Sequence, residues 1–169
     1  RGVTPNLYGQ LILAGKKKYA VIVLDTDGKA LHEALDYQPS CIKPNLYELS
    51  RLAQRDLQTE SDIIGFCERL HDKGIPTILV SRGKAGLLLS STEQKIKAVA
   101  PPVEVGSAVG AGDSVVGGFV LAHSRGKDLA DCVRLACAAG TATAQTPGTE
   151  LCHREDVEDI LPKVQISTL

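Results

Sequence analysis

The chain contains no methionine and no tryptophan, and its 169 residues include only two phenylalanines and four tyrosines. The absence of methionine predicts that the chain as given does not begin at a natural start codon. No apolar run approaches the length of about 18 residues that a membrane-spanning helix needs. The N-terminus also lacks the charged-then-apolar order of a secretory signal. We therefore expect a cytoplasmic protein with no membrane partner.

The sequence also has no excess of positive or negative side chains. The 19 lysines and arginines nearly balance the 20 aspartates and glutamates, so the formal net charge is -1. This balance gives no electrostatic reason to expect nucleic acid as a partner, and any positive potential that binds phosphate must be local. The length suffices for one well-packed core and is short for two, so we expect residues 1–169 to belong to one domain.

Paired cysteine and histidine motifs are also lacking. The five cysteines are odd in number and show no Cys-x-x-Cys spacing, which argues against a zinc site and for free thiols. The four histidines are dispersed along the sequence, and no partner pattern marks any of them as a base or a metal ligand. These residues are Cys41, Cys67, Cys132, Cys137, Cys152, His32, His71, His123 and His153.

A glycine-rich stretch over residues 105–114, followed by an apolar run, is the most informative segment. A glycine turn that leads into a helix presents free backbone N–H groups and the positive end of the helix dipole, which suit a phosphate. Gly110, Ala111 and Gly112 would supply these groups, and Asp113 would lie beside them as a base that accepts a hydroxyl proton. The alternative is a tight turn in which Asp113 only caps the helix. The stretch is neither a P-loop nor a dinucleotide fingerprint, which would need glycine at Val115.

Helical and strand patterns alternate along the chain and predict an α/β fold with a largely parallel sheet and helices on both faces. We expect helices over 5–17 (capped by Thr4), from after Gly28 through Leu35, and over 46–52, 60–73, 129–144 and 153–161, besides the one whose first turn contains Asp113. We expect strands over 19–24, 41–42, 76–80, 86–90 and 96–99, a loop over 81–85 and a polar C-terminal tail. Small residues at helical spacing in 129–144 predict either packing against the preceding helix or a slot for a flat ring.

Two turns that follow predicted strands carry polar residues. Asp25 and Asp27 follow the first strand, and capping of the next helix is the favoured interpretation for both, beside a role near substrate. Lys43 follows the second strand and would either meet a phosphate oxygen or be solvated. Asn45 and Glu48 lie one helical turn apart, so they would either hold water on a nucleotide-bound Mg²⁺ or form a capping box.

Several segments in the same order resemble the ribokinase-like (PfkB) carbohydrate kinases. They are Lys43-Pro44-Asn45 with Glu48-Leu49, Ser81-x-Gly83-x-x-Gly86, Gly110-Ala111-Gly112-Asp113, Ala138–Thr141 and Gly148–Cys152. The likeness is strongest to the minor type of 6-phosphofructokinase. It implies a three-layer αβα fold of which this chain is the C-terminal, nucleotide-binding portion, while the N-terminal part and a β lid are missing.

The resemblance also assigns roles to individual positions. It makes Asp113 the catalytic base and Gly110, Ala111 and Gly112 the anion hole. It places ATP against Lys43, Asn45, Ser81, Gly83, Gly86, Cys137 and Thr141, and a Mg²⁺ held through water by Glu48. It implies that a monovalent cation, K⁺, is bound by backbone carbonyls of Ser107, Val109, Thr143, Thr146 and Gly148.

The reaction that the resemblance implies is ATP-dependent phosphorylation of a sugar phosphate at a primary hydroxyl. Fructose 6-phosphate is the favoured substrate, which would place the protein in glycolysis. Fructose 1-phosphate and tagatose 6-phosphate follow, and a nucleoside or vitamin fits the Lys-Pro-Asn context less well. A second hypothesis is that this 169-residue chain is a nucleotide-binding fragment without catalysis. The complete protein is expected to form a homodimer.

Overall fold

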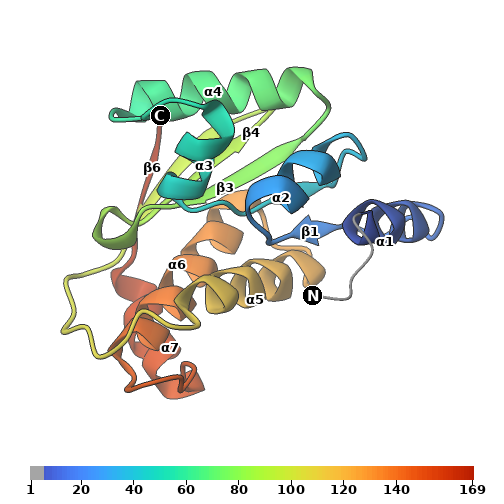
Figure 1. Ribbon diagram of the computed structural model, residues 1–169. Coiled ribbons are helices and arrows are strands. Elements are labelled where there is room, and N and C mark those ends of the chain that lie inside the picture. The colour runs from blue at the N-terminus through green and yellow to red at the C-terminus, as the bar shows by residue number, and fades with distance from the viewer. Residues whose placement is uncertain (1–5) are drawn as a thin grey trace. The chain divides into compact units, whose positions relative to one another are not determined.

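The computed structural model describes residues 6–169, which form seven α-helices, two 3-10 helices and six strands (Figure 1). The α-helices are α1 (Leu7–Lys16), α2 (Gly28–Leu35), α3 (Leu46–Ala53), α4 (Glu60–Asp72), α5 (Ala111–Ser124), α6 (Leu129–Gln145) and α7 (Arg154–Ile160). The strands are β1 (Val23–Leu24), β2 (Cys41–Ile42), β3 (Thr77–Ser81), β4 (Leu87–Ser91), β5 (Lys95–Val99) and β6 (Gln165–Thr168), and the 3-10 helices are η1 (Gly83–Ala85) and η2 (Leu161–Lys163). The cap predicted at Thr4 and Pro5 lies outside the described residues.

The strands are hydrogen-bonded in the order β1-β2-β3-β4-β5-β6, which is also their order in the chain. β1, β2 and β3 are parallel, with Leu24 opposite Ile42 and Ile42 opposite Ile78. β5 and β6 are antiparallel, with Ile96 opposite Thr168. The sheet is thus mixed rather than wholly parallel, because the C-terminal strand returns beside β5.

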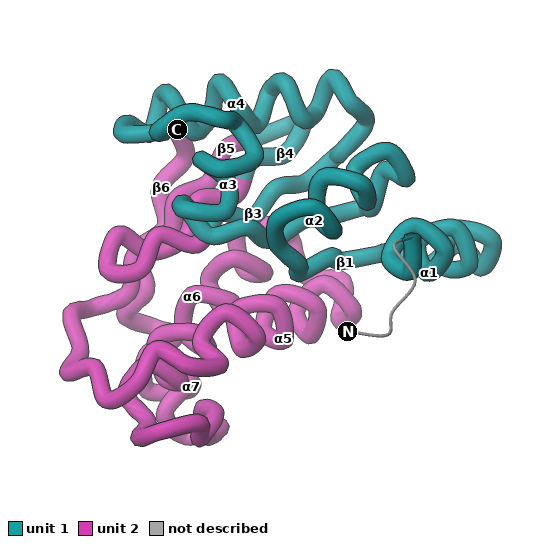
Figure 2. Tube along the Cα trace, in the orientation of Figure 1, with its two compact units in different colours: residues 1–80, 90–94 teal, residues 81–89, 95–169 magenta. Residues whose placement is uncertain are grey.

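The chain divides into two compact units, which Figure 2 colours separately. Unit 1 contains the residues up to Val80 together with Ser90–Gln94, and unit 2 contains Ser81–Leu89 and Lys95–Leu169. Each unit has its own buried side chains. Ile42, Ile78 and Val80 are fully buried in unit 1, and Leu88 and Ala98 are fully buried in unit 2. Continuous burial of this kind is expected of strands that are covered on both faces.

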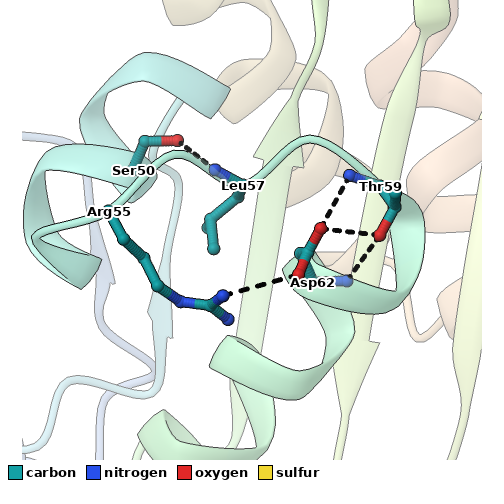
Figure 3. Close-up of polar contacts among 5 residues, drawn as sticks. All are labelled: Ser50, Arg55, Leu57, Thr59 and Asp62. Atoms are coloured by element: carbon teal, nitrogen blue, oxygen red, sulfur yellow. Dashed lines mark hydrogen bonds and ion pairs between the residues drawn. The ribbon is translucent and has the colours of Figure 1, made fainter.

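Side-chain caps mark the start of three helices of unit 1, namely α2, α3 and α4. Figure 3 shows the start of α4, where the Asp62 amide donates to the Thr59 hydroxyl at 3.1 Å. The Asp62 carboxylate accepts from the Thr59 amide at 3.0 Å, and this closes a capping box. The hydrogen bond from the Thr59 hydroxyl is the main cause that lowers the pKa of Asp62. At the other end, Gly74 has a φ of +88°, which confirms it as the glycine that ends the helix.

Two predicted elements were wrong. The strand expected over 19–24 is reduced to Val23–Leu24, since Tyr19 is 97% exposed with a φ of +56°. The Tyr19 and Ala20 amides instead bond the carbonyls of Lys16 and Gly15 and close the end of α1. The polar tail is also wrong, because residues 165–168 form β6. The side chains of β6 are mostly exposed, so the segment needs no alternation of apolar residues that the sequence could reveal. The strand forms through its backbone hydrogen bonds with β5.

Helices α5 and α6 pack against each other in unit 2, as Figure 1 shows. A methyl group on Gly118 would lie 2.9 Å from the Cα atom of Ala136, and one on Gly140 would lie 2.5 Å from Val115 Cγ2. These distances are shorter than side chains tolerate, so only glycine allows the two helices to approach this closely. The small-residue face of 129–144 therefore packs on the preceding helix, the first of the two alternatives that the sequence left open.

Candidate active site

The N-terminus of α5 has the form that the glycine-rich stretch predicts. Gly110 is the N-cap residue, with a left-handed φ of +79°. The first full helical bond runs from the Ser114 amide to the Gly110 carbonyl at 2.9 Å. Of the three residues predicted to form the anion hole, Ala111 is not available, because its amide donates to the carbonyl of Ala108 at 3.3 Å. The amides of Gly112 and Asp113 donate to no group within residues 6–169, so they remain available to an anion at the positive end of the dipole.

Asp113 lies in the first turn of this helix, three residues after the N-cap. Its side chain is exposed and makes no hydrogen bond or ion pair with any residue in the range 6–169. The alternative that Asp113 caps the helix is wrong, because Gly110 is the N-cap and no side chain caps it. The carboxylate is therefore free to accept a proton at the helix entrance.

Two loops meet behind this helix entrance within unit 2. The amides of Gly106 and Ser107 donate to the carbonyl of Ala144, at 2.9 and 3.3 Å. A methyl group on Gly106 would lie 2.7 Å from the carbonyl oxygen of Thr146, so glycine is required for this close approach. The contact brings the segment before Gly110-Ala111-Gly112-Asp113 against the end of α6, so the two segments expected to supply the cation ligands are neighbours.

The carbonyl groups in these loops differ in their fit to a cation. Those of Ser107, Val109, Thr146 and Gly148 accept no hydrogen bond within residues 6–169. The carbonyl of Thr143 already accepts from the Thr146 amide at 3.1 Å and from the Thr146 hydroxyl at 2.8 Å. A carbonyl oxygen has two lone pairs, and these two hydrogen bonds use both of them at Thr143. Thr143 therefore fits the predicted set of backbone ligands least well.

The predicted nucleotide loop is a compact turn between β3 and β4. The Arg82 amide donates to the Gly86 carbonyl at 2.9 Å, and the Gly86 amide donates back to Gly83 at 3.0 Å. Gly83 has a φ of +56° and no neighbour within 4 Å of an added methyl group, so its backbone is open. Gly86 has a φ of +80°, and a methyl group there would lie 2.0 Å from the carbonyl of Ala98 on β5. The loop is thus fixed against β5 on one side and open on the other. Ser81, the first residue of the predicted motif, is the last residue of β3.

Cys137 and Thr141, the two positions assigned to an adenine slot, lie on α6. Cys137 is 3% exposed, and its thiol lies 3.8 Å from the carbonyl oxygen of Ala98. Burial raises the pKa of this thiol to about 11, so it stays protonated at neutral pH. Thr141 is half-buried. Their contact with a nucleotide stays a prediction.

The remaining predicted residues belong to unit 1. Asn45 and Glu48 form a capping box at the start of α3, with both hydrogen bonds at 2.8 Å. Capping is thus confirmed, and the role on hydrated Mg²⁺ stays a prediction. Glu48 also lines an open hollow of about 200 Å³, with Asp27, His32 and Arg51 among the other lining residues. Asp27 is the N-cap of α2, as expected, and its carboxylate also accepts from Arg51 at 2.8 Å.

Lys43 is 5% exposed, and its ammonium group lies 3.4 Å from the carboxylate of Asp25. The solvated alternative for Lys43 is therefore wrong, and Asp25 pairs with a cation rather than being the N-cap of α2. The register explains this pair, since Leu24 and Ile42 are opposite each other and each charged residue directly follows one of them. The sequence signal was the position of both residues directly after neighbouring parallel strands.

Within residues 6–169 no helix combines the length and the apolar character that crossing a bilayer requires. In the same range, no cluster of three or more histidine, cysteine, aspartate or glutamate side chains could hold a metal ion.

Comparison with known proteins places this arrangement in a family. The chain is 36% identical over 161 residues to the ATP-dependent 6-phosphofructokinase isozyme 2 of Escherichia coli, covering 94% of this chain and 52% of that protein. It is 34% identical over 149 residues to the 1-phosphofructokinase of Borreliella burgdorferi, covering 88% of this chain and 48% of that protein. The chain thus spans about half the length of these curated relatives.

A solved structure supports the same assignment. The crystal structure of phosphofructokinase-2 from Escherichia coli in complex with potassium superimposes with a TM-score of 0.89 at 36% identity, over 95% of this chain and 53% of that one. The fold is therefore that of the ribokinase-like kinases. The family model for pfkB family carbohydrate kinases matches residues 4–156, and this chain belongs to that family.

Proposed function

We propose that the protein containing this chain transfers the γ-phosphoryl group of ATP to a primary hydroxyl of a sugar phosphate. The observation that carries the proposal is the entrance of α5. There the amides of Gly112 and Asp113 are free and the Asp113 carboxylate is exposed and unpaired within residues 6–169. Family membership and the names of the relatives support it.

In this reaction a bond forms between the sugar hydroxyl oxygen and the γ-phosphorus, and the bond from that phosphorus to the bridging oxygen of ADP breaks. Asp113 accepts the hydroxyl proton as the new bond forms. The free amides at the start of α5 stabilise the negative charge on the phosphoryl oxygens in the transition state. Because these amides are fixed by the helix, they need no reorganisation at the moment of transfer.

Two metal ions complete the proposal. Mg²⁺ accompanies ATP and lowers the charge repulsion between its phosphates, and Glu48 would hold it through water. A potassium ion would be bound by the carbonyls of Ser107, Val109, Thr146 and Gly148, which are free within residues 6–169. The Escherichia coli structure in complex with potassium supports this ion. We also propose that the complete protein is a homodimer.

The choice of sugar phosphate is the finer part of the proposal. We propose fructose 6-phosphate, as in the name of the Escherichia coli relative, with fructose 1-phosphate as the second candidate, as in the name of the Borreliella burgdorferi relative. The preference rests on the motifs that resemble the minor type of 6-phosphofructokinase, since the identities to the two relatives, 36% and 34%, are nearly equal. A coupled ADP-release assay of the complete protein with fructose 6-phosphate, fructose 1-phosphate and tagatose 6-phosphate decides between them. We expect the 169-residue chain alone to be inactive in this assay.

The variant Asp113→Asn tests the base, and α6 offers a matched control. Asp131 is also an acidic residue in the first turn of its helix, three residues after the N-cap Asp128. Loss of general-base catalysis typically costs about 10² to 10⁴ in rate. We therefore expect Asp113→Asn to lower kcat by at least about a hundredfold, while Asp131→Asn leaves kcat within about twofold.

Both substitutions remove one exposed carboxylate near a helix N-terminus, and Asp131 in addition forms a surface ion pair with Arg134 at 3.8 Å, so each should destabilise the fold by no more than about 1 kcal/mol. Equal kcat values for Asp113→Asn, Asp131→Asn and the unchanged protein would contradict the assignment of the base. Inactivity of the complete protein on all three sugar phosphates would contradict the proposed function as a whole.

A further inference from the structure

The hydroxyl of Thr143 connects three segments around the helix entrance in unit 2. It donates to the Ser114 hydroxyl on α5 at 2.7 Å, and it accepts from the Cys152 amide at 3.0 Å. Thr143 is fully buried and Ser114 is 8% exposed. A single hydroxyl of α6 is thus hydrogen-bonded both to the first turn of α5 and to the loop that follows α6.

The position of Ser114 gives this contact its significance. Ser114 directly follows Asp113, and its amide closes the first helical bond to Gly110. The Thr143 methyl group also faces this turn, since a methyl group added to Gly110 would lie 3.8 Å from Thr143 Cγ2. Thr143 therefore contacts the turn that carries both the free amides and the carboxylate of Asp113.

We propose that Thr143 is a positioning residue, whose hydroxyl fixes the first turn of α5 for phosphoryl transfer. The proposal rests on the proposed function. It concerns the side chain of Thr143 and is separate from the expectation that its backbone carbonyl binds a cation. The hydroxyl makes no contact with the reacting groups and acts through Ser114.

The physical reason is the sensitivity of such catalysis to geometry. A displacement of about 1 Å in a reacting group can cost about a hundredfold in rate. Without the Thr143 hydroxyl, the buried Ser114 hydroxyl and the partly buried Cys152 amide each lose their partner, and the turn can shift to regain one. Asp113 would move with that turn, while the nucleotide loop over 81–86 would not.

The test compares Thr143→Val, which keeps the shape of the side chain and removes the hydroxyl, with Thr143→Ser, which keeps the hydroxyl. Ser90→Ala is the matched control. Ser90 is also fully buried, with a hydrogen bond of 2.9 Å to His71, and it lies outside the proposed site. The complete protein is assayed for kcat and for the KM of ATP, and its melting temperature is measured.

We expect both Thr143→Val and Ser90→Ala to lower the melting temperature, because each removes the hydrogen bonds of a fully buried hydroxyl. Only Thr143→Val should lower kcat, by about tenfold or more, with the KM for ATP changed by less than about threefold. Thr143→Ser should keep kcat within about threefold of the unchanged protein. Equal kcat for Thr143→Val and Ser90→Ala, or equal loss in Thr143→Ser and Thr143→Val, would overturn the proposal.

Ser114→Ala provides a second route should Thr143→Val fail to fold. It removes the acceptor on α5 and leaves the bond from the Cys152 amide to Thr143 in place. We expect it to lower kcat like Thr143→Val, and the double variant to be no slower than Thr143→Val alone, because one interaction is removed twice. Additive losses, or an unchanged kcat in Ser114→Ala, would overturn the proposal while leaving the proposed function standing. An inactive unchanged protein, or an active Asp113→Asn variant, would overturn both.

Discussion

Gly86 offers the sharpest test of how the predicted nucleotide loop over 81–86 is built. Its φ of +80° and ψ of -146° belong to a region that almost only glycine occupies. A methyl group there would also lie 2.0 Å from the carbonyl oxygen of Ala98, whereas ordinary contacts begin at 3.4 Å. Gly86→Ala therefore suffers two penalties, one in the backbone angles and one in the contact with β5.

Gly83, in the same loop, separates these two penalties. Its φ of +56° is also positive, and a methyl group there would meet nothing within 4 Å. Gly83→Ala should therefore cost about 1–2 kcal/mol for the backbone alone. Gly86→Ala should cost about 1–3 kcal/mol for the backbone and a further 1–3 kcal/mol for the displacement of β5, about 2–6 kcal/mol in all.

Urea denaturation followed by circular dichroism measures both variants. The denaturation midpoint should fall in both, and the fall should be larger for Gly86→Ala by the equivalent of about 1–3 kcal/mol at an unchanged m-value. In the complete protein, the KM for ATP should rise more for Gly86→Ala, because its loop must move away from β5. Equal midpoints for the two variants would refute the argument that close approach to β5 requires a glycine at 86.

Two further predictions concern charge and burial. Asp25→Asn leaves the ammonium group of Lys43 buried without its carboxylate. At a separation of 3.4 Å the two charges attract each other by about 5 kcal/mol at an effective dielectric constant of about 20. Because Asp25 is partly exposed, we expect a smaller net loss of stability, about 2–3 kcal/mol. Denaturation should show that the double variant Asp25→Asn/Lys43→Met regains most of this loss, and a double variant as unstable as the sum of its parts would refute the pairing. Burial raises the pKa of Cys137 to about 11, so roughly one thiol in a thousand is ionised at pH 8, and iodoacetamide should label the half-buried Cys152 far sooner. Mass spectrometry of the native protein shows which of the two cysteines is labelled first. Equal rates of labelling at Cys137 and Cys152 would contradict the burial of Cys137.

Local signals in the sequence predicted the helix starts and ends with good accuracy. The terminal Gly74 and the glycine turn before α5 were predicted, and the structure confirms them. The capping box of Asn45 and Glu48 was one of the two alternatives that the sequence left open, and the structure shows that it forms. Each depends on bonds between residues no more than about four positions apart, so the segment itself carries the information. The likeness to the PfkB kinases was likewise predicted from motifs and is confirmed by the family match.

Features that depend on distant segments were not predictable in this way. The strand β6 carries few apolar side chains and exists because β5 offers it a backbone ladder. The pair of Asp25 and Lys43 depends on the register of β1 and β2. A polar segment or a lone charged residue has many possible partners in the sequence, and only the arrangement of the strands selects one.

By itself, the sequence of this protein determined the class of fold, the positions of most helices, and the glycine turn at the entrance of α5 with Asp113 in its first turn. Only the tertiary structure decided what holds that entrance in place. The hydroxyls of Thr143 and Ser114 are 29 positions apart in the chain and 2.7 Å apart in space. Packing of α6 against α5 brings them together, and no local pattern encodes that distance, because it depends on the glycines that let the two helices approach.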